Sequence, residues 1–381
     1  MRVYADQAAT TALGEKAWAA MEPWLRSHFG NPSALYEEGR AAREQVEKSR
    51  EITARLLGAK PRELYFTSGG TEADNWALRL AAEAGARQGR RHLIVSAIEH
   101  HAVLHTARRL EREGFFLTVL PVRENGLVSP EELEKALRPD TALVSVMYAN
   151  NEVGTIQPVY ELGSLCRAHG VLFHTDAVQA AGHLPIDLSG LLADLLSLSA
   201  HKFHGPKGIG ALYVREGVQP ERLLEGGAQE RGFRAGTENV AGIAGLAAAL
   251  EESLLDRERK DRAVRALRDS LEKRLLEIPG SFVNGDRQNR LPGNLSIGFA
   301  DVEAEALLLY LDMKGIAVSA GAACAAGALE PSHVLTAMGL SAPLARSTLR
   351  ISLDETNTRA DVDYIAEVLP AAVARLRSMA G

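Results

Sequence analysis

The sequence predicts an α/β protein in which a mostly parallel central sheet is covered by helices on both faces, together with a smaller α+β domain. Over the first two-thirds of the 381 residues, short apolar runs alternate with longer helical patterns, which is typical of βαβ units. After Thr237 the pattern changes to a long helical tract that reaches about Glu277. We therefore expect a large domain at residues 13–258 and a small domain made of residues 1–12 and 259–381.

The strands of the large sheet are expected at short apolar runs: Leu64–Thr67, Leu93–Ala97, Phe116–Leu120, Ala142–Tyr148, Val171–Thr175, Leu195–Ser199 and Gly210–Val214. Helices are expected between them at Ala34–Leu57, Glu72–Gln88 and Val159–His169. Gly58 and Gly170 directly follow two of these patterns, and a glycine in that place is typical of a helix end. In the small domain we expect strands at Asn294–Phe299 and Thr348–Leu353 and helices at Glu303–Met313 and Arg359–Ser378.

Composition and charge exclude several classes of partner. The chain has 43 basic and 49 acidic residues, a formal charge of −6, and no basic block, which argues against a nucleic-acid or anionic-membrane surface. No apolar run approaches the roughly 20 residues that span a bilayer, and the first residues carry no targeting pattern. We therefore expect a cytoplasmic protein that binds neither nucleic acid nor membrane. The two cysteines, Cys166 and Cys324, are too few for a disulfide framework.

A candidate anion site follows the first strand of the large sheet. The segment Ser68-Gly69-Gly70-Thr71-Glu72 opens a helix, so free backbone N–H groups and a hydroxyl converge there. A plain capped helix start is the alternative. The segment matches neither G-x-G-x-x-G nor the P-loop, which argues against nucleotide chemistry.

Lys202 and Asp176 each follow an apolar strand. Lys202 comes after the run 193–200 and lies in a turn-rich segment, so we expect its amine to enter a pocket, where a desolvated lysine can form a Schiff base with a carbonyl cofactor. Lys207, between Pro206 and Gly208, is the rival, although such turn lysines are usually exposed. Asp176 lies where parallel strands open into a ligand crevice and can pair with a cationic ring nitrogen; the alternative is a helix N-cap.

His100 and Arg350 are the next candidates. His100 follows a strand, and its imidazole can stack on a planar ring or act as acid and base, unless it is an exposed residue at a helix start. His101 and His105 share a helical face, but without H-E-x-x-H or a cysteine pair we expect no metal site. Arg350 lies on the strand face opposite Leu349 and Ile351, where its guanidinium can bind a carboxylate or simply face solvent.

The two cysteines are expected to differ in role. Cys324 lies in the small-residue run 318–328, from which we expect a thiol to reach into a pocket and withdraw; a buried, inert position is the commoner alternative. Cys166 lies on a helix beside Leu162 and Leu165 and is expected to serve packing.

Together these features resemble the pyridoxal-phosphate enzymes of fold type I, in the class V aminotransferase branch, and within it the cysteine desulfurases of the NifS/IscS type. The resemblance spans nearly the whole chain. It rests on YADQAATT at 4–11, FGNPS at 29–33, TSGGTE at 67–72, EH at 99–100, NNEVG at 150–154, DAVQ at 176–179, HK at 201–202, RAGTEN at 234–239, and the Cys324 run followed by LEP at 329–331.

The resemblance implies a role for each of these positions. Lys202 would hold pyridoxal 5'-phosphate, with Asp176 on the ring nitrogen, Gln179 on the ring hydroxyl, His100 stacked on the ring, and Gly70, Thr71, Ser199 and His201 on the phosphate. Thr237 would come from the second subunit of a homodimer. Asn151 would contact cofactor and substrate, Arg350 the substrate carboxylate, with Asn31 nearby. Cys324 would take sulfur from L-cysteine as a persulfide, leaving L-alanine, and pass it to an iron–sulfur scaffold or sulfur-carrier protein.

Three other readings stay open at this point. A class V aminotransferase or lyase would keep the cofactor residues but has no use for the Cys324 thiol. A non-catalytic scaffold would need a damaged cofactor site, and the sequence shows none. A nucleotide-binding α/β protein lacks its glycine fingerprint.

Overall fold

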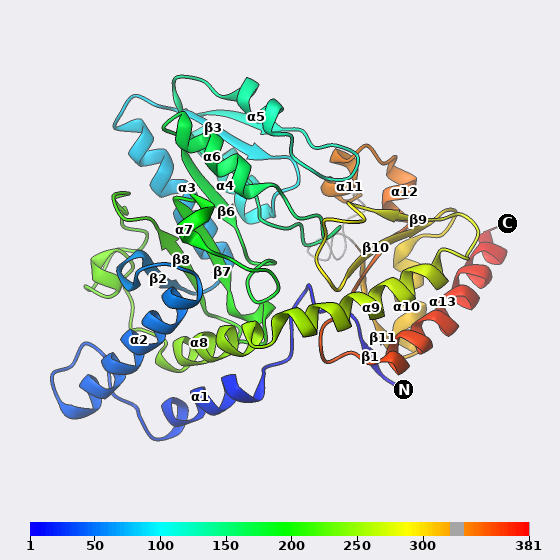
Figure 1. Cartoon of the computed structure of the whole chain (residues 1–381), viewed down its shortest axis with the longest axis horizontal. Coiled ribbons are helices and arrows are strands. Elements are labelled where there is room, and N and C mark those ends of the chain that lie inside the picture. The colour runs from blue at the N-terminus through cyan, green and yellow to red at the C-terminus, as the bar shows by residue number, and fades with distance from the viewer. Residues whose placement is uncertain (321–330, 381) are drawn as a thin grey trace.

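The computed structural model describes residues 1–320 and 331–380. Within them, the largest sheet has seven strands (Figure 1). Their order across the sheet is β2 (Leu64–Thr67), β8 (Gly210–Val214), β7 (Leu195–Ser199), β6 (Leu172–Asp176), β5 (Thr141–Ser145), β3 (His92–Ser96) and β4 (Phe116–Leu120). From β7 to β4 neighbouring strands are parallel, whereas β8 is antiparallel to both of its neighbours. The expected mostly parallel sheet is confirmed.

Helices cover both faces of this sheet. One face packs against α3 (Gly70–Ala86) and α4 (His101–Arg112). The other face packs against α2 (Glu37–Leu56), α5 (Pro130–Ala136), α6 (Val159–Ala168), α7 (Leu188–Leu191) and α8 (Val240–Leu254). Helix α1 (Glu15–Arg26), which the sequence analysis did not predict, lies against α8. The hydrophobic core is therefore split into two layers by the sheet, as an α/β architecture requires.

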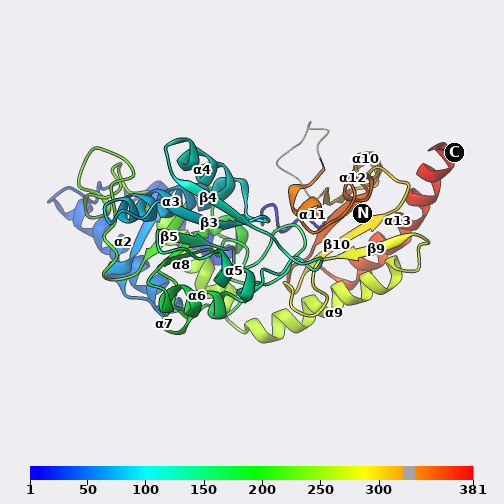
Figure 2. The ribbon, with the colours of Figure 1, turned by 90° about the horizontal axis from the view of Figure 1, so that it is seen from above.

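The second part of the molecule has its own sheet and its own apolar core (Figure 2). The strand order is β12 (Ser319–Ala320), β13 (Thr348–Ser352), β10 (Asn294–Phe299) and β9 (Ser281–Asn284), all antiparallel. A separate pair joins β1 (Val3–Tyr4) to β11 (Ile316–Ala317). The helices are α9 (Arg257–Leu275), α10 (Ala304–Met313), α11 (His333–Ala337), α12 (Ala342–Arg346) and α13 (Arg359–Ala380).

The boundary between the two parts falls near the junction of α8 and α9. The long helical tract consists of these two helices, which meet at Asp256, a residue with a left-handed φ of 54°. Strand β1 belongs to the small sheet region although it stands first in the chain. The limits 13–258, and 1–12 with 259–381, stay a prediction. In the part of the chain that the structure describes, no helix is both long enough and apolar enough to cross a membrane.

Cys166 lies in the core between α6 and the large sheet. Its side chain has no solvent exposure and packs in the same cluster as Leu162 and Phe173. Burial raises the pKa of the Cys166 thiol to about 12, so the thiol stays protonated at neutral pH. The expected packing role is confirmed by this position.

Candidate active site

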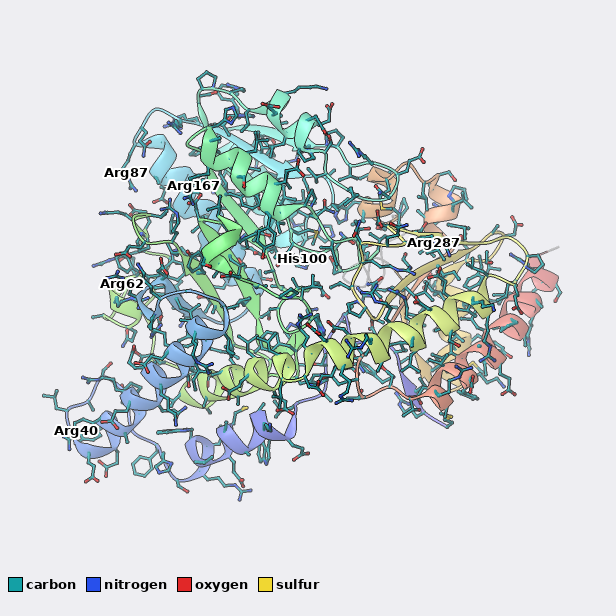
Figure 3. The ribbon with its side chains drawn as sticks, in the orientation of Figure 1. Arg40, Arg62, Arg87, His100, Arg167 and Arg287 are labelled. Atoms are coloured by element: carbon teal, nitrogen blue, oxygen red, sulfur yellow. The ribbon has the colours of Figure 1, made fainter. Side chains whose placement is uncertain are left out.

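A cavity of about 460 Å³ lies where the large sheet meets the small sheet. Ten of the predicted residues line it: Gly70, Thr71, His100, Asn151, Asp176, Gln179, Ser199, His201, Lys202 and Arg350. They come from the N-terminus of α3, from the ends of large-sheet strands and the segments that follow them, and from β13 of the small sheet. Figure 3 shows His100 between the two parts, whereas the labelled Arg40, Arg62 and Arg87 lie toward the edge of the view.

Lys202 ends a single 3₁₀ turn that follows β7 directly. Its Nζ donates hydrogen bonds to the carbonyl oxygens of Ala8 and Ala9, both at 2.7 Å. The Ala8 carbonyl also accepts a hydrogen bond from Gln179 Nε2 at 2.9 Å. Lys207 is exposed and does not line the 460 Å³ cavity. Because the Lys202 side chain lines the cavity and the Lys207 side chain does not, the structure favours Lys202 as the cofactor lysine.

Asp176 is the last residue of β6 and lines the cavity. Its side chain is buried, and its Oδ1 accepts a hydrogen bond from the Val178 amide at 2.8 Å. Burial raises the pKa of Asp176 to about 6, although the Val178 amide and the nearby Lys202 charge act in the opposite direction. A buried carboxylate in this setting is stabilised by a cationic partner, which a protonated ring nitrogen would supply.

His100 is the N-cap of α4. Its Nδ1 accepts a hydrogen bond from the Ala102 amide at 3.1 Å, so the neutral ring carries its proton on Nε2. Burial, followed by repulsion from Lys202 and neighbouring histidines, lowers the pKa of His100 to about 4. The imidazole is therefore neutral at physiological pH. In this state it can stack on a cofactor ring without repelling a protonated ring nitrogen.

The start of α3 forms an anion cradle beside the cavity. Thr71, Ser199 and His201 line a hollow of about 350 Å³ with the first residues of the helix. A side chain at Gly70 would place its Cβ 2.6 Å from a methyl group of Val178, so glycine is needed for this close approach. The free N–H groups of a helix of this length suit a phosphate.

These groups fit pyridoxal phosphate. One cavity presents an amine, a buried carboxylate and a neutral imidazole, and an anion cradle adjoins it with shared residues. This is the set of donors and acceptors that the cofactor's aldehyde, ring nitrogen, ring face and phosphate require.

Arg350 is almost fully buried, with 2% of its surface exposed, so its strand face is not solvated. Its Nη1 donates to the Asn151 carbonyl at 3.0 Å, and its Nη2 donates to Asp6 Oδ1 at 2.8 Å. Among the described residues, none accepts a hydrogen bond from its Nε. A buried guanidinium at a cavity wall, with N–H groups left over after the bonds to Asn151 and Asp6, is suited to bind a carboxylate.

Three predicted residues are not on this cavity. Asn31 and Thr237 are exposed; Thr237 lines a separate hollow of about 210 Å³ near Ser68 and Arg234. Cys324 lies outside the described residues. Their roles stay predictions.

Residues 4–11 are among the motifs of the resemblance, but the sequence analysis gave them no role in the site. We call residues 5–11 the N-terminal strap, which links the two halves of the site. Its amides at positions 7 and 8 donate to the backbone oxygen and side chain of Ser352 on β13. At its other end the Thr11 amide donates to the His201 carbonyl at 2.9 Å. Most of these contacts use backbone atoms, which leave no local signal in the sequence.

Comparison with known proteins places the chain in a family. The class V aminotransferase family model matches residues 3–365. A cysteine desulfurase IscS from Methanosarcina thermophila is 51% identical over 377 residues, which cover 99% of this chain and 93% of the relative. A solved structure of a NifS-like protein is 40% identical with a TM-score of 0.93, and the match covers 99% of this chain and 100% of that one. A solved structure described as SspA in complex with cysteine is 38% identical with a TM-score of 0.82, covering 93% and 99%. The chain therefore belongs to the class V aminotransferase family, whose members use pyridoxal phosphate.

Proposed function

We propose that this protein is a cysteine desulfurase, which converts L-cysteine to L-alanine and receives the sulfur on Cys324 as a persulfide. The observation that carries the proposal is the single cavity that brings Lys202, Asp176, His100 and Arg350 together. Relatives named cysteine desulfurase match nearly the whole chain, which supports the same reaction here.

The cofactor and the substrate would be held by different sides of the cavity. Gly70, Thr71, Ser199 and His201 would hold the phosphate, and Asp176, Gln179 and His100 would hold the ring. Lys202 would hold pyridoxal phosphate until the substrate amine takes that place. The group would supply an acceptor for electrons from the substrate's Cα, which makes the substrate's sulfur open to attack. Arg350 would fix the substrate carboxylate, with Asn151 beside it.

The chain's own groups then carry the proton and sulfur transfers. The substrate amine would displace the Lys202 amine from the cofactor, and the freed Lys202 amine would accept the Cα proton. The Cys324 thiolate attacks the substrate sulfur, so that a sulfur–sulfur bond forms as the Cβ–sulfur bond breaks. The electron pair of the broken bond returns to Cβ, which becomes the methyl group of alanine after protonation.

The test is to add L-cysteine to the purified holoprotein and measure alanine and sulfide together in the presence of a reducing thiol. We expect the two products in equal amounts. Alanine without sulfide, or sulfide with pyruvate in place of alanine, would point to a different lyase reaction and would contradict the proposal.

Replacing Arg350 with lysine is expected to raise the KM for L-cysteine about 100-fold, because lysine keeps the charge but loses the planar fork that binds a carboxylate. The visible absorption of the bound cofactor should be unchanged. Steady-state kinetics of Arg350→Lys beside the exposed control Arg112→Lys measures the effect. A KM within two-fold of the wild-type value would remove Arg350 from the substrate site.

Assembly and partners are part of the same proposal. Thr237 is exposed and lies off its own chain's cavity, which supports a homodimer in which each Thr237 completes the partner's phosphate site. A fully active monomer in sedimentation would contradict this. We also propose a cytoplasmic location, where the Cys324 thiol stays reduced, and an iron–sulfur scaffold or sulfur-carrier protein as the sulfur acceptor.

A further inference from the structure

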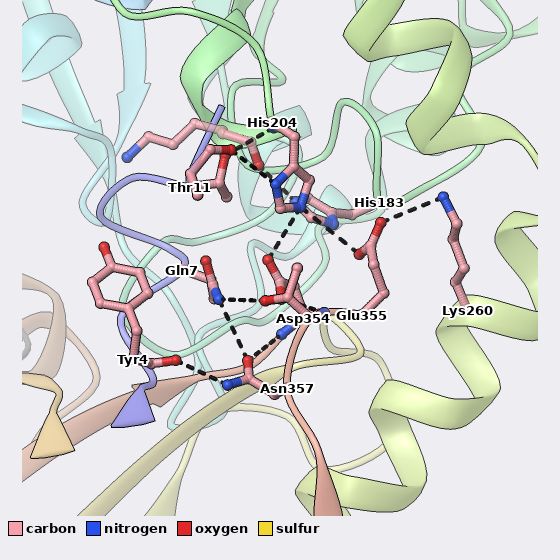
Figure 4. A network of polar contacts seen from close by, with 12 residues as sticks. Tyr4, Gln7, Thr11, His183, His204, Lys260, Asp354, Glu355 and Asn357 are labelled. Atoms are coloured by element: carbon pink, nitrogen blue, oxygen red, sulfur yellow. Dashed lines mark hydrogen bonds and ion pairs between the residues drawn. The ribbon is translucent and has the colours of Figure 1, made fainter. Parts of the chain in front are cut away.

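A network of polar side chains beside the cavity connects three parts of the chain (Figure 4). It joins the N-terminal strap, the turn that follows Lys202, and the loop 354–357 that follows β13. Neither His204 nor Asp354, at the centre of the network, lines the 460 Å³ cavity. The network members labelled in Figure 4 are Tyr4, Gln7, Thr11, His183, His204, Lys260, Asp354, Glu355 and Asn357.

His204 stands two residues after Lys202 and is held on several sides. Its backbone has a left-handed φ of 62°, and its amide donates to Thr11 Oγ1 at 2.8 Å. Its Nδ1 lies 3.1 Å from the Ala12 carbonyl, and its Nε2 lies 3.1 Å from Asp354 Oδ2. Nδ1 is placed to donate to the Ala12 carbonyl, and Nε2 lies at ion-pair distance from Asp354 Oδ2 without forming a hydrogen bond to it. A carbonyl on one side and a carboxylate on the other favour the doubly protonated imidazolium.

Asp354 is fixed on its own side of the pair. Its Oδ1 accepts hydrogen bonds from the amide and hydroxyl of Thr356, at 2.8 and 2.6 Å. Its amide donates to Asn357 Oδ1 at 3.0 Å, and Asn357 in turn donates to the Tyr4 carbonyl at 2.9 Å. Asp354 lies two residues beyond the end of β13, the strand that carries Arg350. The ion pair therefore connects the turn of Lys202 to the strand of Arg350.

We propose that the His204–Asp354 ion pair is a strut that sets the separation between the Lys202 amine and the Arg350 guanidinium. The inference rests on the proposed function, in which the Lys202 amine accepts the substrate's Cα proton and Arg350 holds the carboxylate of the same substrate. In an α-amino acid the Cα hydrogen and the carboxylate are a fixed distance apart. A shift of Arg350 relative to Lys202 therefore weakens its bond to the substrate carboxylate and raises KM. His204 and Asp354 are thus positioning residues, which act through Lys202 and Arg350.

The charged neighbours decide how the strut responds to pH. Glu355 Oε2 lies 4.0 Å from His204 Nε2, and Lys260 of α9 pairs with Glu355. His183 Nε2 contacts the Lys202 carbonyl, and Lys202 itself is close in sequence. Burial disfavours the charge on His204, but Asp354 and then Glu355 outweigh it and raise the pKa of His204. The strut is therefore present below the raised pKa and is lost as the pH rises through it.

The test uses Asp354→Asn, which keeps the shape and removes the charge, with the exposed Asp312→Asn as control. For Asp354→Asn we expect the KM for L-cysteine to rise about 10-fold, while kcat changes less than about two-fold and the cofactor absorption is retained. The wild-type KM should rise on the alkaline side of the profile. His204→Lys should keep KM within about three-fold of wild type and move that rise to higher pH, because lysine stays charged there.

Three outcomes would overturn the strut. The first is an unchanged KM in Asp354→Asn. The second is a loss of both stability and kcat in Asp354→Asn, with the same losses in His204→Lys although lysine keeps the charge. That result would indicate a merely structural pair. The third is a ZnCl₂-dependent rise in Tm of the wild type that Asp354→Asn loses, because the ligand atoms of His204, Asp354 and Glu355 all lie within 4.8 Å of one another.

A readout without substrate separates this inference from the proposed function. In the NMR titration of the histidine ring protons, the pKa of His204 should fall in Asp354→Asn and stay unchanged in Asp312→Asn. An unchanged His204 pKa in Asp354→Asn would contradict the ion pair. A wild-type protein that makes no alanine from L-cysteine would instead contradict the proposed function.

Discussion

Alanine in place of Lys202 is expected to abolish the covalent attachment of pyridoxal phosphate and to lower cysteine turnover by at least about 1000-fold. Lys202 supplies an amine at the cavity wall between the ring-binding residues and the N-terminal strap. Wild-type protein should be yellow and should yield a stable adduct after borohydride reduction, whereas Lys202→Ala should yield none. Absorption spectra and peptide mapping of the reduced protein measure both effects.

The matched control for this change is Lys48→Ala, on the exposed face of α2. It should keep the colour, the adduct and the turnover of the wild type. An adduct that maps to Lys207 would show that the wrong lysine has been assigned, even if the protein is yellow.

Alanine in place of Cys324 is expected to leave cofactor binding intact and to lower sulfide production by several orders of magnitude, because no thiolate remains to accept the sulfur. Cys324 lies outside the described residues, so this expectation comes from the sequence and from the family resemblance. Alkylation after a single turnover, followed by mass spectrometry, should place the persulfide on Cys324. Sulfide release in the presence of a reducing thiol gives the rate.

Cys166→Ala is the matched control, since the chain has these two cysteines. The Cys166 thiol is buried and its pKa is raised to about 12, so it cannot serve as a ready nucleophile. Its replacement should cost about 1 kcal/mol in the free energy of unfolding and little activity. A persulfide on Cys166, or near-normal desulfuration by Cys324→Ala, would refute the sulfur-transfer step.

Strands and strand-end residues were predicted well because their signals are local. The runs at β2, β4, β7, β8 and β10 match the observed bounds, since each is a short apolar segment limited by turn residues. The central sheet then brings the strand-end residues to one edge, which is why Asp176 and Lys202 share a cavity. In β5 the apolar run continues to Tyr148, beyond the strand end at Ser145, because the chain stays buried after it leaves the sheet.

Other features could not be predicted because their causes are distant in the sequence. Strand β9 has a partly exposed, irregular pattern and is formed by pairing with β10. The sequence alone allows Arg350 to be either solvated or buried. Its burial depends on the Asp6 carboxylate, which accepts a hydrogen bond from Arg350 and lies far away in the sequence. His204 and Asp354 are 150 positions apart, and neither carries a local pattern that indicates the other.

The N-terminal strap has a consequence for how the protein is made. Asp6 leaves the ribosome early, yet its partner Arg350 is synthesised 344 residues later. In the same way, β1 cannot pair until β11 has been synthesised. Contacts of such high sequence separation form late and slowly. We therefore expect a ribosome-bound chain that stops before β13 to fold its large sheet but to lack a closed cavity, so that cofactor loading follows the completion of synthesis.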